Sequence, residues 1–226
     1  MLDTVIFDVD GTLVDSSYHH LLAWSRAFAA VGVVVPSCRL HACMGMGGDK
    51  LVAAAAGDPV EKAVGDEIRD RWQHEYDGLL GEVRAFPDAV ATLEAFRHAG
   101  LSVVLATSGH EDHIERTLEI LELTRDDFPL VSSADVDETK PAGDLVDLAM
   151  DKVSGNHGVL IGDTVWDVHA GEQADVPVLG VLTGGIAEER LRSAGALRVF
   201  DDVAAVGHSV RDVVAFFART PAASGS

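Results

Sequence analysis

From residue 86 onward, short apolar runs alternate with longer stretches in which apolar residues recur at helical spacing. Short apolar runs bounded by glycine or polar residues are typical of buried strands, and the longer stretches predict amphipathic helices. We predict strands at 101–106, 130–132, 158–161 and 176–181, and helices at 87–99, 110–121, 142–152 and 166–173. This alternation indicates an α/β fold built on a doubly wound parallel sheet.

The chain opens with one more apolar strand, Val5–Phe7, and a different pattern follows it. Residues 15–82 show helical periodicity almost throughout, interrupted by glycine-rich breaks. We therefore predict a helical domain at 15–82, inserted after the first strand of a core domain that comprises residues 1–14 and 83–220. The tail, residues 221–226, is predicted to be disordered.

Composition restricts the possible partners. Apolar residues make up 47% of the 226 residues, so the chain can bury a large core, and its formal net charge is −20. Nucleic acids and anionic membranes are bound through Lys and Arg, so this charge argues against both as partners. An anionic substrate would need a local attractor, such as a metal ion, a lysine or a helix N-terminus.

The remaining global signals are negative. No signal peptide and no apolar run of membrane-spanning length is visible, so we expect a soluble, cytoplasmic protein. Cys38 and Cys43, with His41 between them, form a weak zinc pattern because no fourth ligand is near. We expect both cysteines to lie on a half-buried helix instead.

Polar residues follow three of the predicted strands. The first strand ends at Asp8 and Asp10, a second ends at Thr107-Ser108-Gly109, and a third is followed by Asp163 and Asp167. In doubly wound sheets, ligands bind beyond the carboxyl ends of the strands, so these residues predict one shared site. That site requires the strand ending at Ile161 to lie beside the first strand, with Thr107 supplied from the other side.

Four carboxyl groups in one crevice cannot all be ionised without compensation. A hard dication resolves the conflict, and Mg²⁺ is the usual choice where a phosphate completes the coordination. Lys140, followed by Pro141, stands at a predicted helix start on the same side of the sheet. A lysine there can contact a carboxylate and a phosphoryl oxygen together.

These motifs resemble, in order, the four motifs of the haloacid dehalogenase superfamily. They are Asp8-Val-Asp-Gly-Thr-Leu-Val-Asp15, Ala106-Thr107-Ser108, Lys140-Pro141 and Gly162-Asp-Thr-Val-Trp-Asp167. The resemblance covers the core, and the helical insertion resembles that family's smaller helical cap. One departure is Lys140-Pro-Ala-Gly-Asp144, where many members carry a second proline before the aspartate.

The resemblance implies a catalytic role for each motif. Asp8 would be the nucleophile that forms an aspartyl-phosphate, and Asp10 would be the general acid and base. Lys140 would offset charge on the nucleophile and on the phosphoryl group. Mg²⁺ would be held by Asp8, the backbone carbonyl of Asp10, and Asp163, with Asp167 positioning a water or Lys140.

The implied substrate contacts are less specific. The Thr107 hydroxyl and the backbone N–H groups of Ser108 and Gly109 would bind the phosphoryl oxygens, and His110 the leaving group. In the cap, the run Gly45-Met-Gly-Gly48, and Gly47 in particular, is either a substrate contact or a plain interhelical turn. Whether His19, His20 or Lys50 contacts substrate stays open. We expect His113 to be solvated, and Trp24 and Trp72 to lie in the core of the helical domain.

Three functions follow from the resemblance. The first is a Mg²⁺-dependent phosphatase acting on a small phosphorylated metabolite, similar to the phosphoglycolate phosphatase branch. The second is a phosphomutase of the β-phosphoglucomutase type, which shares the cap and all four motifs. The third, a catalytically silent binding protein on the same fold, predicts a missing catalytic group, and the sequence lacks none.

Overall fold

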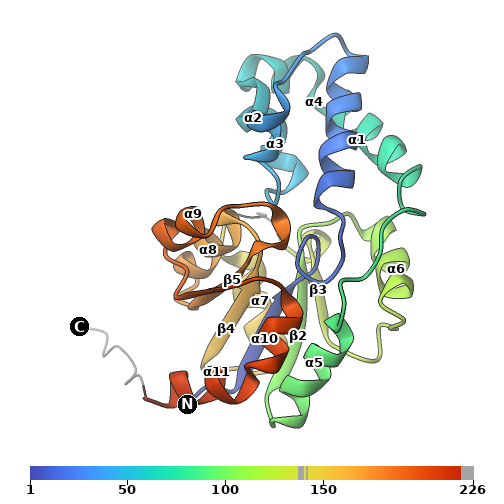
Figure 1. Ribbon diagram of the computed structural model, residues 1–226. Coiled ribbons are helices and arrows are strands. Elements are labelled where there is room, and N and C mark those ends of the chain that lie inside the picture. The colour runs from blue at the N-terminus through green and yellow to red at the C-terminus, as the bar shows by residue number, and fades with distance from the viewer. Residues whose placement is uncertain (137–139, 141, 220–226) are drawn as a thin grey trace.

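The computed structural model contains a six-stranded parallel sheet with helices on both faces (Figure 1). It describes residues 1–136, 140 and 142–219. The strand order is β3-β2-β1-β4-β5-β6, which places β1 near the middle. The strands are β1 Thr4–Asp8, β2 Ser102–Thr107, β3 Leu130–Ser132, β4 Gly158–Gly162, β5 Val178–Val181 and β6 Arg198–Phe200. The doubly wound parallel α/β fold predicted from the sequence is confirmed.

Alternate residues of β1 belong to different halves of the core, because successive side chains on a strand point to opposite faces. Val5 and Phe7 pack into one hydrophobic cluster, and Ile6 packs into another. The first face is covered by α5 Ala89–His98, α6 Glu111–Ile120, α10 Val203–His208 and α11 Val210–Arg219. The second face is covered by α7 Asp144–Lys152, α8 Val165–Gln173 and α9 Glu188–Ala194.

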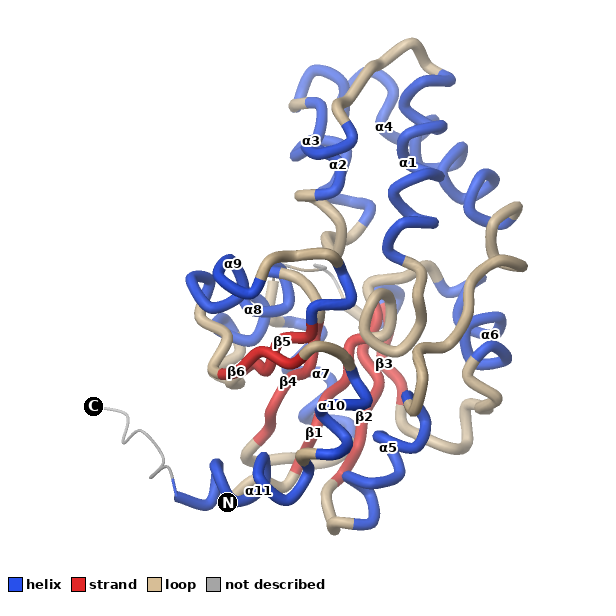
Figure 2. The backbone as a smooth tube through the Cα atoms, viewed as in Figure 1, coloured by secondary structure: helices blue, strands red, loops and turns tan. Residues whose placement is uncertain are grey.

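Four helices between β1 and α5 pack on one another beyond the carboxyl ends of the strands (Figure 2). They are α1 Ser17–Ala30, α2 Ser37–His41, α3 Gly48–Ala56 and α4 Asp58–Asp77, and we call them the helical unit. They share a hydrophobic cluster centred on Trp24 and Phe28, to which Trp72 adds its ring. Trp24 and Trp72 stack with ring centroids 5.0 Å apart, as expected for core residues of this segment.

Most predicted elements form within two residues of their predicted ends, and the strand at Leu130–Ser132 matches fully. The apolar pattern predicts no individual elements after residue 181, where α9, β6, α10 and α11 follow. Strand β6 has three half-buried residues and includes Arg198, so it lacks the apolar run that marked the other strands. Pro141 and the tail at 221–226 lie outside the described residues.

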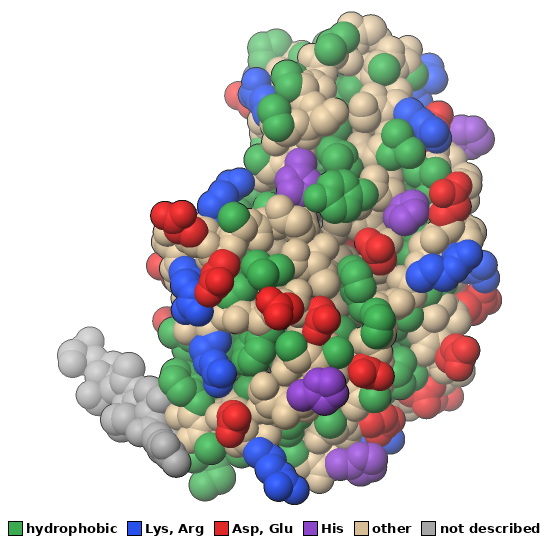
Figure 3. All heavy atoms as spheres, viewed as in Figure 1, with side chains coloured by type: hydrophobic (Ala, Val, Ile, Leu, Met, Phe, Trp, Pro, Cys, Tyr) green, Lys and Arg blue, Asp and Glu red, His purple; other side chains and the backbone are tan. Residues whose placement is uncertain are grey.

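The surface is rich in carboxylates. Figure 3 shows acidic side chains scattered over the sheet-containing part of the visible face, interspersed with Lys and Arg. Among the helices of the described residues, none is both long and apolar enough to cross a membrane.

Candidate active site

The sheet topology brings the three polar strand ends to one edge. Strand β1 pairs with β2 on one side and β4 on the other, with Asp8 opposite Ala106 and Phe7 opposite Ile161. The residues that follow each strand therefore emerge side by side. This confirms the predicted adjacency of the first strand and the strand that precedes Asp163.

Three carboxylates form a buried cluster at this edge. One oxygen from each of Asp8, Asp163 and Asp167 lies within 4.8 Å of the others, and all three side chains are buried. Within the part of the chain that the structure describes, these three carboxylates form a group that could hold a metal ion. Carboxylate oxygens are the ligands that hard dications prefer.

Lys140 is the counter-charge in this cluster. Only 2% of its surface is exposed, and its ammonium contacts Asp8 Oδ1 and lies 2.5 Å from Asp167 Oδ1. Burial alone would lower the pKa of Lys140, but the charges of Asp167 and Asp8 raise it well above its usual range. The lysine is therefore held as a cation between two carboxylates.

One lysine does not balance three carboxylates. Burial raises the pKa of Asp8, and the Asp167 carboxylate adds to this effect while Lys140 opposes it. Burial also raises the pKa of Asp163 well above its usual value, reinforced by the charges of Asp8 and Asp167. These directions mean that the ionised cluster lacks positive charge.

Of the three carboxylates, Asp163 most clearly lacks hydrogen-bond donors and positive charge. Its Oδ1 is within reach of the Thr12 hydroxyl at 3.3 Å, but its buried Oδ2 has no hydrogen-bond partner among the described residues. The backbone crowds this oxygen: a Cβ at Gly11 would lie 2.3 Å from it and one at Gly184 1.9 Å. A buried acceptor without a donor, beside two further carboxylates, fits a bound cation.

The start of α8 fixes the direction of Asp167. The Thr164 hydroxyl accepts hydrogen bonds from the backbone N–H groups of Trp166 and Asp167, and Asp167 Oδ2 accepts from the Thr164 backbone N–H at 3.0 Å. This reciprocal capping arrangement satisfies the free N–H groups of the helix end. It leaves Oδ1 of Asp167 directed at Lys140.

Asp10 is separate from the carboxylate cluster and is surrounded by donors. Its Oδ1 accepts from the Ser16 hydroxyl at 2.7 Å and lies 3.1 Å from His20 Nε2, while its Oδ2 accepts from the Thr107 hydroxyl at 3.1 Å. Burial would raise the pKa of Asp10, but these contacts, led by His20, hold it below its usual range. His20 also stacks on Tyr76, with ring centroids 3.9 Å apart.

A cavity opens onto both groups of carboxylates. Asp8, Asp10, Asp163 and Lys140 line its base. Ser108, Gly109 and Thr164 also line it, and the helical unit, together with the loop between α2 and α3, supplies the rest of its wall. The lining residues from that unit and loop are Ser17, His20, Trp24, Met44, Gly45, Met46, Gly48, Leu51 and Trp72.

The glycines of the 45–48 run, predicted either to contact substrate or to form an interhelical turn, divide into two kinds. Gly45 and Gly48 line the cavity, whereas Gly47 is buried and directs its backbone N–H to the Lys140 carbonyl at 3.5 Å. Gly45 has φ +91°, and a Cβ there would lie 2.6 Å from the Thr164 hydroxyl. The glycine loop therefore packs against the start of α8 and contributes to the cavity wall.

Two residues predicted to contact substrate near the second motif lie outside the lining of the cavity that contains Asp8. His110 does not line the cavity that contains Asp8: half of its side chain is exposed, and its Nδ1 accepts from the Asp112 backbone N–H at the start of α6. Thr107 is also absent from that lining, because its hydroxyl is directed to Asp10. Both residues line an adjoining apolar hollow instead.

His113, expected to be solvated, is buried. Its Nε2 lies 2.9 Å from Asp77 Oδ1 at the end of α4, and its ring meets the edges of Tyr76 and Trp72. Burial lowers the pKa of His113, with Asp77 opposing the shift. His113 thus joins α6 to the helical unit.

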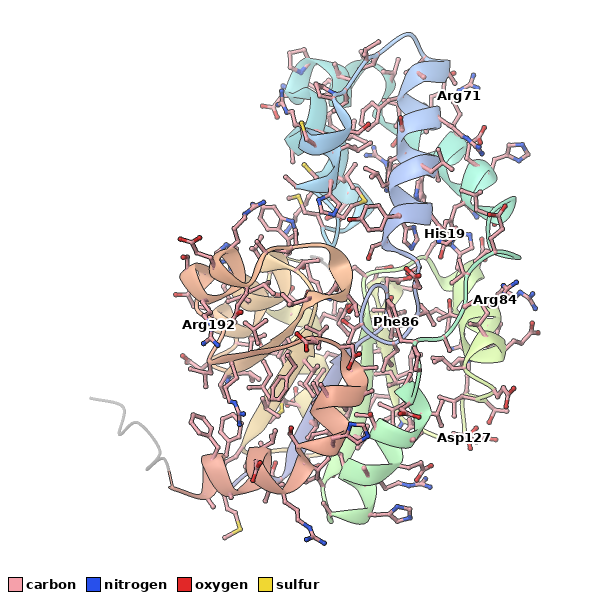
Figure 4. All side chains as sticks on the ribbon, in the orientation of Figure 1. His19, Arg71, Arg84, Phe86, Asp127 and Arg192 are labelled. Carbon is pink, nitrogen blue, oxygen red and sulfur yellow. The ribbon has the colours of Figure 1, made fainter. Side chains whose placement is uncertain are left out.

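Other predicted candidates are not part of the carboxylate cluster. His19 lies at the base of α1, next to the sheet-containing part (Figure 4), and Lys50 is half-buried on α3 and does not line the cavity. Cys38 is exposed, while the buried Cys43 donates to the Arg39 carbonyl. His41 contacts the Gly184 carbonyl at 3.0 Å rather than either cysteine.

Comparison with known proteins identifies the family. Residues 5–181 match the model of the haloacid dehalogenase-like hydrolases. The chain belongs to this family. A phosphoglycolate phosphatase of Rhodospirillum rubrum is 28% identical over 92% of this chain and 90% of its own length. One from Caulobacter vibrioides is 30% identical over 85% and 84%. A hydrolase structure from Pseudomonas syringae superposes with a TM-score of 0.89 at 30% identity, covering 93% of this chain and 99% of that one.

The site of this haloacid dehalogenase-like hydrolase includes polar residues that the sequence analysis did not single out. Thr12, Ser16 and Thr164 each hydrogen-bond a carboxylate of the site. All three lie within four residues of Asp8, Asp15 or Asp163 in the sequence motifs. This proximity in sequence could have identified them as hydrogen-bond partners of the site. His20 was raised as a substrate contact, and its link to Asp10 is set by the course of α1.

Proposed function

We propose that this protein is a phosphatase that hydrolyses a small phosphomonoester through an aspartyl-phosphate on Asp8. The observation that carries the proposal is the buried cluster of Asp8, Asp163 and Asp167 around Lys140, at the base of a cavity that Asp10 also lines. The phosphoglycolate phosphatases among its relatives support the same class of reaction.

We further propose Mg²⁺ as the cofactor, held by Asp8 and Asp163 with Asp167 and the Asp10 backbone carbonyl nearby. Three ionised carboxylates and one ammonium leave two unbalanced negative charges, which one dication neutralises. The unpartnered Oδ2 of Asp163 is a ligand atom available to it. When bound, the ion supplies positive charge to the phosphoryl oxygens and to the nucleophile.

Each residue then has a defined task. Asp8 attacks phosphorus, the P–O bond to the alcohol breaks, and water later attacks phosphorus to release phosphate. Asp10 is the group that exchanges protons with the leaving alcohol and with that water. Because its pKa is lowered here, it must take up a proton before it can act as the acid. Lys140 keeps Asp8 in place and offsets charge in the transition state. Ser108 and Gly109 line the cavity where phosphoryl oxygens would bind.

The helical unit fits the role of a cap over this site, with residues 15–82 as the cap and residues 1–14 and 83–220 as the core. Cap and core contact one another through Trp166 Nε1, which donates to the Ala42 carbonyl at 3.2 Å, and through Gln73 Nε2, which donates to Asp112 at 2.8 Å. A cap closed in this way excludes water from the reacting groups. It also limits the substrate to a small molecule.

The test is phosphate release from a panel of small phosphomonoesters. Asp8→Asn should reduce release to background, because an amide is not a nucleophile toward phosphorus, while circular dichroism stays unchanged. The exposed Asp151→Asn on α7 is the matched control and should keep full activity. EDTA should silence the wild type, and Mg²⁺ should restore it.

Undiminished phosphate release by Asp8→Asn would contradict the role of Asp8 as the nucleophile. Undiminished release in EDTA would contradict the role of Mg²⁺. Conversion of a sugar monophosphate with its phosphate retained would instead indicate the phosphomutase.

A further inference from the structure

Apart from Ser17, His20 and two glycines, the cavity wall contributed by the helical unit and the loop between α2 and α3 is apolar and aromatic. Trp24 and Trp72, stacked on each other, line it together with Met44, Met46 and Leu51. Within the proposed reaction, the phosphoryl group lies at the carboxylate end and the alcohol part of the substrate faces this wall. Thioether and indole surfaces bind apolar groups through burial and dispersion.

The cavity offers no spare cation among the described residues that line it. Lys140 is the one lysine or arginine in this lining, and Asp8 and Asp167 already hold it. The ring of His20 is engaged with Asp10. The two lysines of the helical unit, Lys50 and Lys62, do not line the cavity.

A groove that adjoins the cavity is acidic. It shares Gly48, Trp72 and Ser108 with the cavity, and it is also lined by Asp49, Asp66, Arg69 and Asp70. The guanidinium of Arg69 is occupied: it donates to Glu61 at 2.8 and 3.0 Å and to Asp66 at 2.8 Å. Negative charge therefore exceeds positive charge along this approach, which disfavours entry of an additional carboxylate.

The free polar groups of the wall are neutral. The Ser108 hydroxyl and the Trp72 indole N–H are buried, and neither has a hydrogen-bond partner among the described residues. Such groups can bind a hydroxyl or ether oxygen of a substrate. They do not neutralise a carboxylate, which would be desolvated here without a counter-charge.

We propose that the phosphomonoester hydrolysed here carries an uncharged, largely apolar alcohol part, and that esters bearing a carboxylate are disfavoured. The inference rests on the proposed phosphatase function and narrows its substrate class. It sets this chain apart from relatives named for phosphoglycolate, whose organic part is a carboxylate.

The experiment compares kcat/KM for matched esters that differ in charge. One pair is 2-hydroxyethyl phosphate and phosphoglycolate, and the other is phenyl phosphate and 4-carboxyphenyl phosphate. We expect the neutral member to be preferred by about tenfold or more in both pairs. Equal rates, or preference for the carboxylate, overturn the inference while leaving the phosphatase function intact. Absence of phosphate release from every ester overturns both.

A substitution in the wall provides an independent test. Met46→Arg places a cation beside the cavity. We expect it to raise kcat/KM for phosphoglycolate, relative to kcat/KM for 2-hydroxyethyl phosphate, by about tenfold. Met46→Gln, similar in length but neutral, is the matched control and should leave the ratio near that of the wild type. The same ratio in all three proteins, each confirmed as folded by circular dichroism, counts against the proposal. The wild-type comparison stands whether or not a variant folds.

Discussion

Asp163→Asn should make the metal-free protein more stable and, in the same variant, abolish stabilisation by Mg²⁺. Asp163 is 1% exposed, and burial together with two neighbouring carboxylates raises its pKa. A group whose pKa is higher in the folded state opposes folding once the pH rises above its unfolded value, which is about 3.9 for Asp. Replacing it with the isosteric amide removes that cost.

The magnitude follows from the distances. Two like charges within 4.8 Å repel by about 3 kcal/mol at an effective dielectric constant of about 20. Asp163 has two such neighbours, and the Lys140 ammonium offsets part of the repulsion. We therefore expect the variant to gain about 2–4 kcal/mol in free energy of unfolding in EDTA at pH 8, a rise in Tm of roughly 5–10 °C.

The assay is thermal and urea unfolding of wild type and variant, in EDTA and in Mg²⁺. Mg²⁺ at a hundred times its Kd should stabilise the wild type by about 2.7 kcal/mol and should leave the variant unchanged. The advantage of the variant in EDTA should shrink as the pH falls toward 4, because Asp163 then becomes protonated in the wild type. A variant that is less stable in EDTA, yet still stabilised by Mg²⁺, would refute the reasoning.

Three further predictions concern other parts of the site. Lys140→Met should destabilise the protein by about 3–5 kcal/mol in urea unfolding and lower kcat at least a thousandfold, because it leaves buried carboxylates unpaired. Gly45→Ala should cost more stability than Gly32→Ala in the same assay; both glycines have positive φ, but only at Gly45 would a Cβ clash. Between pH 7 and 5 the wild type should lose more stability than His113→Gln, because the pKa of His113 is lowered on folding and the unfolded chain binds its proton first.

The local pattern was sufficient for most of the fold and for the chemical core of the site. Apolar runs marked five of the six strands, and the polar residues after β1, β2 and β4 marked the edge of the sheet at which the site forms. Strand direction and pleat are local properties, so Asp8 and Asp163 could be placed together before the structure was known. Strand β6 was missed because it lacks an apolar run.

The contacts between helices could not be predicted in this way. His113 was expected in solvent, yet α4 covers it with Asp77 and Tyr76. His110 lines a hollow that adjoins the cavity containing Asp8, and not that cavity itself. Which face of a helix meets another helix depends on packing angles and on side chains distant in the sequence. Helical periodicity identifies an apolar stripe without identifying its partner.

By itself, the sequence determined the sheet and the identity of the buried carboxylates, because spacing along a strand dictates where each side chain points. The family followed from the resemblance of its four ordered motifs. The tertiary structure alone decided the wall of the cavity. Trp24 and Trp72 come from different helices and meet only when α1 packs against α4. Met46 lines the cavity beside Gly45, which packs closely on Thr164. The apolar character of that wall is a property of packing between segments, which no single stretch of the chain encodes.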